Sequence, residues 1–233
     1  MSARPPRRRA DSPIRERLHA LPKQTEIPYV LAESEDHLVA LALALGARDV
    51  GGWSPEEEAV ATAALAASGA PPDAKRLDAV RSEVDAGADP LGDALCALRS
   101  PEDRRPMGAT YTPREIVVSM TLWSWRHATP ARVVDPGAGS GRFLVAAGRA
   151  FDGADLVGSE LDPVAAILAR GHLAAAGLAA QSRVVLGDYR SLALAPISGR
   201  TLYLGNPPYV RHHLISPEWK GWLGDTARRR GLK

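Results

Sequence analysis

Four short apolar segments in the second half of the chain constrain its fold more than any other feature. They are RVVDPG, ADLVGSEL, SRVVLGDY and TLYLGNPP, which begin at residues 132, 154, 182 and 201. Helical stretches separate them, notably GRFLVAAGRA and DPVAAILARGHLAAAG. Strand–helix alternation of this kind favours right-handed crossovers and a parallel sheet. We therefore expect an α/β fold with about four parallel strands within residues 101–233.

A second, helical region is expected before the sheet, over residues 29–100. Its composition is rich in Ala and Leu, and SPEEEAV places Ser54 as an N-cap, Pro55 at the first helical position and Glu57 in the capping-box position. Two more helices are indicated by DAKRLDAVRSEVDAG and DPLGDALCALRS. No residue of this region suggests chemistry, so we interpret it as a scaffold. Residues 1–28 are rich in Arg and Pro and are expected to form a basic, disordered tail.

The composition excludes several classes of protein. The single cysteine, Cys96, rules out an internal disulfide and a cysteine metal cluster. No apolar run reaches the roughly 20 residues of a membrane span, and the N-terminus lacks the apolar core of a secretion signal. These features predict a cytoplasmic protein. The net charge of +2 is too small to indicate a partner, although both ends of the chain are rich in arginine.

Each predicted strand ends in polar or glycine-rich residues. In an open α/β sheet, ligands bind at the carboxyl ends of the strands. The four ends should therefore converge on one site. The glycine loop after the first strand, DPGAGSGRF, contains Gly137, Gly139 and Gly141, which allow a ligand to approach the backbone closely. Arg142 occupies the place of the last glycine in a dinucleotide fingerprint, and no Gly-Lys-Ser/Thr follows, so neither a dinucleotide site nor a P-loop is predicted.

The ends of the next two strands suggest a nucleoside. Glu160 lies about twenty residues after the loop, where a carboxylate suits ribose hydroxyls, while Asp162 is better placed to cap the following helix. Asp188 offers an acceptor for an amino group, and Tyr189 offers a face for stacking. The expected ligand is adenosine that carries a small substituent.

Two further motifs flank this set. TPREIVVSMTLWSW has Thr112, Pro113 and Glu115 in capping-box places before a helix. The last strand meets Asn206 and two prolines, which must end it because proline cannot donate to a sheet ladder.

These motifs together resemble those of a known family. Residues about 108–213 resemble the S-adenosylmethionine-binding half of amino-methylating DNA methyltransferases, most closely the gamma-class adenine-N6 enzymes of bacterial restriction–modification systems. The resemblance rests on the ordered set GATYTPREIV, VVDPGAGSGRFL, GSELDP, GDY and NPPYV. It implies a Rossmann-like class I methyltransferase sheet and S-adenosyl-L-methionine as the cofactor.

The resemblance also implies roles for individual residues. Thr112, Asp135, Gly137 and Gly139 should line the methionine end of the cofactor, Glu160 should bind the ribose hydroxyls, and Asp188 and Tyr189 should flank the adenine. Asn206 and the Pro207 carbonyl should accept hydrogens from the amino group of a target adenine and aim its lone pair at the sulfonium methyl. Tyr209 should stack on the flipped-out base. No metal is required.

Some expectations separate this chain from a complete enzyme of the family. Family sheets have seven strands and a target-recognition domain, whereas only four strands are found here. We therefore expect a fragment, or a subunit that a second chain completes. Two alternatives stay open for the function: methylation of a protein glutamine or an RNA guanine, and an inactive cofactor-binding remnant.

Overall fold

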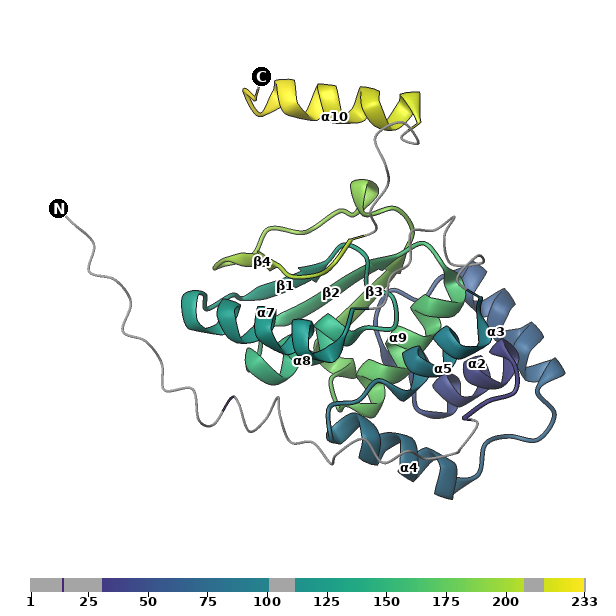
Figure 1. Cartoon of the computed structure of the whole chain (residues 1–233). Helices are drawn as coiled ribbons and strands as arrows, with labels where there is room; N and C mark the ends of the chain where they lie inside the picture. The colour runs from purple at the N-terminus through teal and green to yellow at the C-terminus, as the bar shows by residue number, and fades with distance from the viewer. Residues whose placement is uncertain (1–13, 15–30, 101–111, 208–215, 233) are drawn as a thin grey trace.

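A computed structural model of the protein describes residues 14, 31–100, 112–207 and 216–232. Its centre is a parallel sheet of β1 (Arg132–Asp135), β2 (Asp155–Glu160), β3 (Ser182–Leu186) and β4 (Thr201–Tyr203). Within the described residues the strand order is β3-β2-β1-β4, as Figure 1 shows. The predicted α/β fold with four parallel strands is confirmed.

Helices α7 (Arg114–His127), α8 (Arg142–Ala150) and α9 (Pro163–Ala175) pack against the sheet (Figure 1). The crossovers through α8 and α9 step along the sheet in the same direction, so right-handed connections place both helices on one face. One apolar cluster joins that face to the helices. It includes Val117, Leu122, Val133, Phe143, Leu144, Leu156, Ala169, Leu173 and Val184.

The strand order sets the position of a ligand crevice. The chain runs outward from β1 through β2 to β3 and then returns to the other side of β1 as β4. The direction of progression therefore reverses between β1 and β4. Ligands of open α/β sheets bind outside the carboxyl ends of the strands at such a switch point. The glycine loop after β1 and the Asn206 segment after β4 flank it.

The helical region is built of α2 (Glu35–Ala44), α3 (Pro55–Ala67), α4 (Ala74–Asp85) and α5 (Pro90–Leu98). The Ser54–Glu57 capping box predicted for α3 is confirmed, with both of its hydrogen bonds formed. A second apolar cluster buries α2–α5 against α9. It includes Leu38, Leu41, Ala64, Val80, Leu91, Leu95, Ile167 and Leu168. Helix α9 therefore packs against the sheet on one side and against the helical region on the other.

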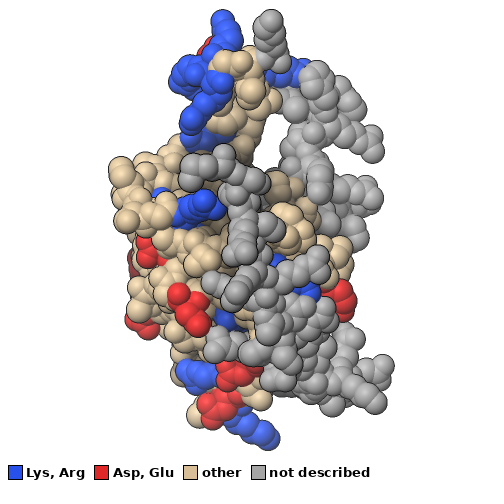
Figure 2. Space-filling model, turned by 90° about the vertical axis from the view of Figure 1, so that its left-hand side faces the viewer, with Lys and Arg blue, Asp and Glu red and all other residues tan. Residues whose placement is uncertain are grey.

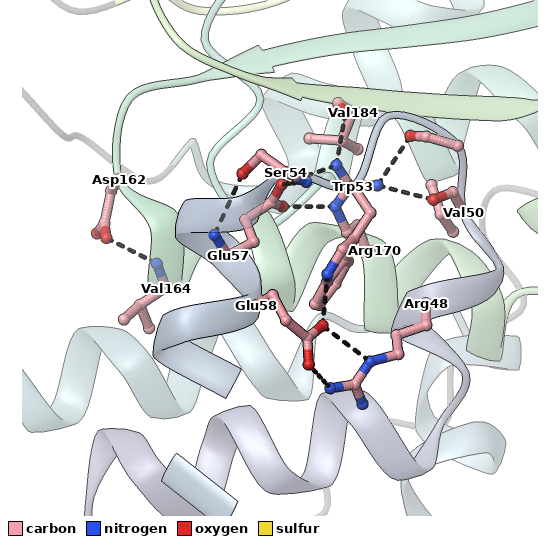
Figure 3. Close-up of polar contacts among 11 residues, drawn as sticks. Arg48, Val50, Trp53, Ser54, Glu57, Glu58, Asp162, Val164, Arg170 and Val184 are labelled. Carbon is pink, nitrogen blue, oxygen red and sulfur yellow. Dashed lines mark hydrogen bonds and ion pairs between the residues drawn. The ribbon is translucent and has the colours of Figure 1, made fainter. Parts of the chain in front are cut away.

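A buried ion pair crosses this boundary (Figure 3). The Arg170 guanidinium on α9 donates to both carboxylate oxygens of Glu57 on α3, at 2.6 and 3.2 Å, and both side chains are 0% exposed. Arg170 also donates to the carbonyls of Val50, Gly51 and Val184 at 2.8, 2.8 and 2.6 Å. Because Val184 belongs to β3, one side chain links α3, the segment before it and the sheet.

The segment around Gly51 also covers the outer edge of β3. Gly51 N donates to the Ser182 carbonyl at 3.1 Å, and Val184 N donates to the Gly51 carbonyl at 3.0 Å. These bonds partly satisfy the edge strand, which would otherwise offer open backbone groups. The helical region therefore covers part of this sheet edge as well as packing against α9.

The last helix, α10 (Pro217–Arg229), follows the N-cap Ser216, whose hydroxyl accepts from Trp219 N at 3.2 Å. Trp219 and Trp222 lie with their ring centroids 6.3 and 6.4 Å from that of Tyr189. Figure 2 shows basic side chains gathered at the top of the molecule, where α10 lies in Figure 1.

Several expectations fall outside the described residues. The predicted tail over 1–28 does so except at Ile14, which is 4% exposed and packs in the sheet-side cluster. Tyr111, Pro208 and Tyr209 are also not described. Among the helices that are described, none is both long and apolar enough to cross a membrane.

Candidate active site

The loop after β1 turns sharply at the carboxyl edge of the sheet. Gly139 and Gly141 have φ angles of 53° and 88°, in the left-handed region that glycine adopts most easily. A Cβ on Gly141 would lie 3.3 Å from the Cα of Ala169 on α9, so close packing also favours glycine there. The loop therefore passes tightly between β1 and α9 and presents its backbone at the switch point.

Asp135 ends β1 directly beneath this loop. Its Oδ1 accepts a hydrogen bond from Gly137 N at 3.1 Å, while its Oδ2 is buried and has no partner among the described residues. Burial raises the pKa of Asp135 to about 7, the Gly137 hydrogen bond opposes that rise, and the nearby Glu160 carboxylate adds to it. A cationic group placed beside Oδ2 would satisfy this oxygen and favour its ionised form.

Glu160 ends β2 and faces the same loop. Its Oε2 accepts from Gly139 N at 2.7 Å, and its Oε1 accepts from the backbone N–H groups of Leu161 and Asp162 at 2.8 and 3.0 Å. Burial raises the pKa of Glu160, and these three hydrogen bonds oppose that effect. Because a carboxylate oxygen has more than one lone pair, Oε2 can also accept from a hydroxyl group.

Asp162 caps α9, as predicted, by accepting from Val164 N at 3.0 Å. It also forms an ion pair with Arg99, whose other nitrogens donate to Glu35 at 2.8 and 2.7 Å. The turn after β2 is therefore tied to the helical region. The sequence indicated the cap but not this ion pair.

Asp188 and Tyr189 follow β3, where Tyr189 begins the short helix η4 (Tyr189–Ser191). The Asp188 carboxylate accepts from the backbone N–H and the guanidinium of Arg190, at 2.9, 2.8 and 2.5 Å, which holds the pKa of Asp188 below its usual range. Tyr189 is 40% exposed. The Arg190 guanidinium carbon lies 3.6 Å from the centroid of the neighbouring Trp219 ring. An adenine ring entering here would share Asp188 with Arg190.

Asn206 and Thr112 meet across the switch point. Asn206 Nδ2 donates to Thr112 Oγ1 at 3.0 Å, although the two residues are far apart in the sequence. The predicted capping box at α7 is wrong in this respect: the N-cap is Pro113, with no side-chain capping bond. The Thr112 hydroxyl is engaged by Asn206 and its carbonyl by Arg142, so the residue serves the site instead of the helix.

The structure brings most of the predicted site residues to one edge. Gly187 N donates to the Glu160 carbonyl at 2.7 Å, and a Cβ on Gly205 would overlap the Asp135 carboxyl group. The ends of neighbouring strands are therefore in direct contact. Pro207 is described and exposed, while Tyr209 lies outside the described residues.

Sequence reasoning missed two polar residues at this edge, Asp89 and Arg142. Asp89 accepts from the Ser140 hydroxyl in the glycine loop and from Arg142 Nε at 2.7 Å. In the sequence, Asp89 is only the first residue of DPLGDALCALRS, a segment that indicates a helix, and Arg142 is only a departure from a glycine fingerprint. Neither pattern indicates that the two residues meet.

Comparison with known proteins gives one strong similarity. The chain is 42% identical over 209 residues to the Type II methyltransferase M.XamI of Xanthomonas campestris pv. amaranthicola. The chain is related to that methyltransferase. The match covers 86% of this chain and 37% of the relative, so the chain spans little more than a third of the relative's length. No protein-family model matches the chain.

The residues at the edge fit the cofactor that the motifs implied. S-adenosylmethionine carries an α-ammonium group, and Asp135 Oδ2 is a buried acceptor that lacks a partner in the described structure. In the glycine loop, Gly137 N lies 3.1 Å from the other oxygen of the same carboxylate. Glu160 and Asp188 follow along the same edge, at the ends of β2 and β3.

Proposed function

We propose that the chain is the cofactor-binding and catalytic part of an S-adenosylmethionine-dependent Type II DNA methyltransferase that methylates the N6 amino group of adenine. On this proposal it belongs to a restriction–modification system. The observation that carries the proposal is the position of Asn206. It lies at the end of β4, across the switch point from Asp135, with its Nδ2 held by Thr112.

Each residue at the edge has a role in this proposal. S-adenosylmethionine supplies the methyl group when bound. Asp135, Gly137, Gly139 and Thr112 would hold its methionine end, and Glu160 would hold its ribose. Asp188 and Tyr189 would flank its adenine.

Asn206 and Pro207 would act on the acceptor. The amino group of adenine is a poor nucleophile because its lone pair is delocalised into the ring. Asn206 Oδ1 and the Pro207 carbonyl would accept its two hydrogens and so localise the lone pair on nitrogen. Positioning and electrostatic stabilisation of this kind can supply several kcal/mol of barrier reduction. Because Nδ2 is committed to Thr112, Oδ1 is the Asn206 atom directed to the acceptor.

DNA is the acceptor that the remaining features favour. The relative is a Type II methyltransferase. A base must leave the duplex before its amino group can be reached, and Tyr209 would stack on the flipped base. Lys220, Arg228, Arg229 and Arg230 give α10 and its end a basic character that suits phosphates (Figure 2).

Calorimetric titration with S-adenosylmethionine tests the cofactor half of the proposal. The wild-type chain should bind, Asp188→Ala should lose binding, and Asn206→Ala should retain it because Asn206 serves the acceptor. Binding that is lost in Asn206→Ala but kept in Asp188→Ala would contradict the assignment of the two sites.

Product analysis tests the acceptor. The chain is incubated with unmethylated DNA and radiolabelled cofactor, and the DNA is digested to nucleosides. N6-methyladenine that disappears in Asn206→Ala supports the proposal, and N4-methylcytosine would correct it. Label in a glutamine-containing protein or in RNA, with none in DNA, would favour the alternative acceptors. A chain that binds cofactor and methylates DNA only with a second polypeptide would be a subunit of a split enzyme.

A further inference from the structure

Asp89 links the helical region to the glycine loop. It is the N-cap of α5, where its Oδ1 accepts from Gly92 N at 2.9 Å, and it is 6% exposed. Its Oδ2 accepts from the Ser140 hydroxyl and from Arg142 Nε at 2.7 Å. His172 Nδ1 lies 3.4 Å from Oδ1. A helix cap needs only one of these contacts, so the others require a different explanation.

Arg142 extends this link toward the acceptor side of the site. Its Nη1 donates to the Thr112 carbonyl at 3.0 Å, and its Nη2 forms an ion pair with Asp93. The guanidinium is a planar fork, so two carboxylates that hold it also fix the direction of its remaining N–H groups. With Asp89 and Asp93 on α5, the position of the Thr112 backbone depends on the helical region.

Thr112 completes the path to Asn206. It is 7% exposed, its carbonyl is held by Arg142, and its hydroxyl accepts from Asn206 Nδ2 at 3.0 Å. The orientation of the Asn206 amide matters chemically. If the amide were reversed, it would present NH₂ to the amino group of the acceptor, and two donors cannot form a hydrogen bond.

We propose that Asp89 and Arg142 are positioning residues that fix the Asn206 amide through Thr112, so that the helical region sets the geometry of the acceptor site. This inference rests on the proposed role of Asn206. On this proposal the helical region helps to align the reacting groups, although its sequence suggested only a scaffold.

A matched pair of arginines on α8 separates positioning from stabilisation. Arg149 lies two turns after Arg142 and also binds the helical region, through the Val84 carbonyl of α4. It has no described contact with Thr112 or Asn206. Removing either arginine loosens α8 from the helical region, but only removal of Arg142 breaks the path to Asn206.

The first test observes Asn206 directly, because it is the only asparagine in the chain. Selective ¹⁵N-asparagine labelling therefore gives a single side-chain amide pair in an NMR spectrum of the full chain. In Arg142→Met and in Thr112→Val, this pair should move toward the position of an unbonded amide and exchange faster with solvent. In Arg149→Met it should stay at the wild-type position.

Thr112→Val still tests the proposal if Arg142→Met fails to fold, because it removes only the hydrogen bond between Thr112 and Asn206. In that case Asp89→Ser, which can still cap α5 but removes the carboxylate and adds no second asparagine, takes the place of Arg142→Met. The proposal would be overturned if the Asn206 signal moves in Thr112→Val but stays at the wild-type position in the Arg142 or Asp89 variant. An equal response to Arg149→Met would overturn it too.

Methyl-transfer kinetics provide a second readout. Arg142→Met should lower kcat by up to about 100-fold. Because Thr112 is also proposed to hold the methionine end of the cofactor, the Kd for S-adenosylmethionine should rise as well, but by a smaller factor. Arg142→Lys should recover only part of the rate, because an ammonium cannot span the carboxylates and the carbonyl as a planar fork does. A loss confined to cofactor affinity, or full recovery with lysine, would contradict the proposal.

The two proposals fail in different ways. If the wild-type chain transfers no methyl group to DNA, the proposed function loses its support, while the Asn206 signal still decides whether the path exists. If the wild-type chain methylates DNA and the Asn206 signal does not move in Arg142→Met, only the positioning proposal is contradicted.

Discussion

Glu57 and Glu58 are adjacent on α3, and each forms an ion pair with an arginine, yet their environments are opposite (Figure 3). Glu57 and Arg170 are 0% exposed, whereas Glu58 and Arg48 have side chains 48% and 44% exposed. The pair offers a stability test in which residue type, helix and partner type are matched. Burial differs, and so does one local bond each: Glu57 accepts from Ser54 N in the capping box, and Glu58 accepts from Trp53 Nε1.

Glu57→Ala should be strongly destabilising. The substitution leaves the Arg170 charge buried, although the Val50, Gly51 and Val184 carbonyls still accept from it. Removing one partner of a buried ion pair typically costs about 3–5 kcal/mol, because the other charge stays uncompensated. For a domain of this size that corresponds to a melting temperature lowered by about 6–20 °C.

Glu58→Ala is the control. Its ion pair with Arg48 is screened by solvent, so the variant should unfold close to the wild-type urea concentration. Urea unfolding followed by circular dichroism measures both variants, and equal m-values would show that the denatured state is unchanged. Similar losses of stability in the two variants would refute the reasoning that burial decides the value of these pairs.

Three further predictions use the same unfolding measurements. The folded-state pKa of Asp135 is about 7, above the ordinary 3.8, so its contribution to stability is fully present below 3.8 and is lost as pH rises through 7. The free energy of unfolding of Asp135→Asn relative to wild type should therefore grow across that interval, by at most about 4 kcal/mol. A difference that does not change with pH would contradict the raised pKa of the buried Asp135 carboxyl group. Gly171→Ala places a Cβ 2.7 Å from Ala42 Cβ and should cost about 1–3 kcal/mol, whereas Gly221→Ala has no neighbour within 4 Å and should raise the helix content of α10. Ser54→Ala removes the capping box of α3 and should cost about 1 kcal/mol, and a neutral result would mean that the cap adds nothing beyond packing.

Local patterns in the sequence predict the helices, the strands and the polar residues at the strand ends. Apolar strands alternate with helices over residues 132–204, and local signals such as Ser54 and Asp162 mark where helices begin. These features are short-range, since a cap or a strand depends on residues a few positions apart. The convergence of Asp135, Glu160 and Asp188 also followed from the sequence, because the carboxyl ends of parallel strands share one edge.

The contacts between the helical region and the site follow from packing between distant elements, which no local pattern predicts. The sequence separates Glu57 from Arg170, and Asp89 from Arg142, by many residues, and neither pair has a local signature. Thr112 shows the limit most clearly: its spacing predicts a helix cap, but Asn206, brought to it by the return of the chain to β4, binds its hydroxyl. A local pattern fixes what a residue can bond to, and the packing of distant elements decides which partner it finds.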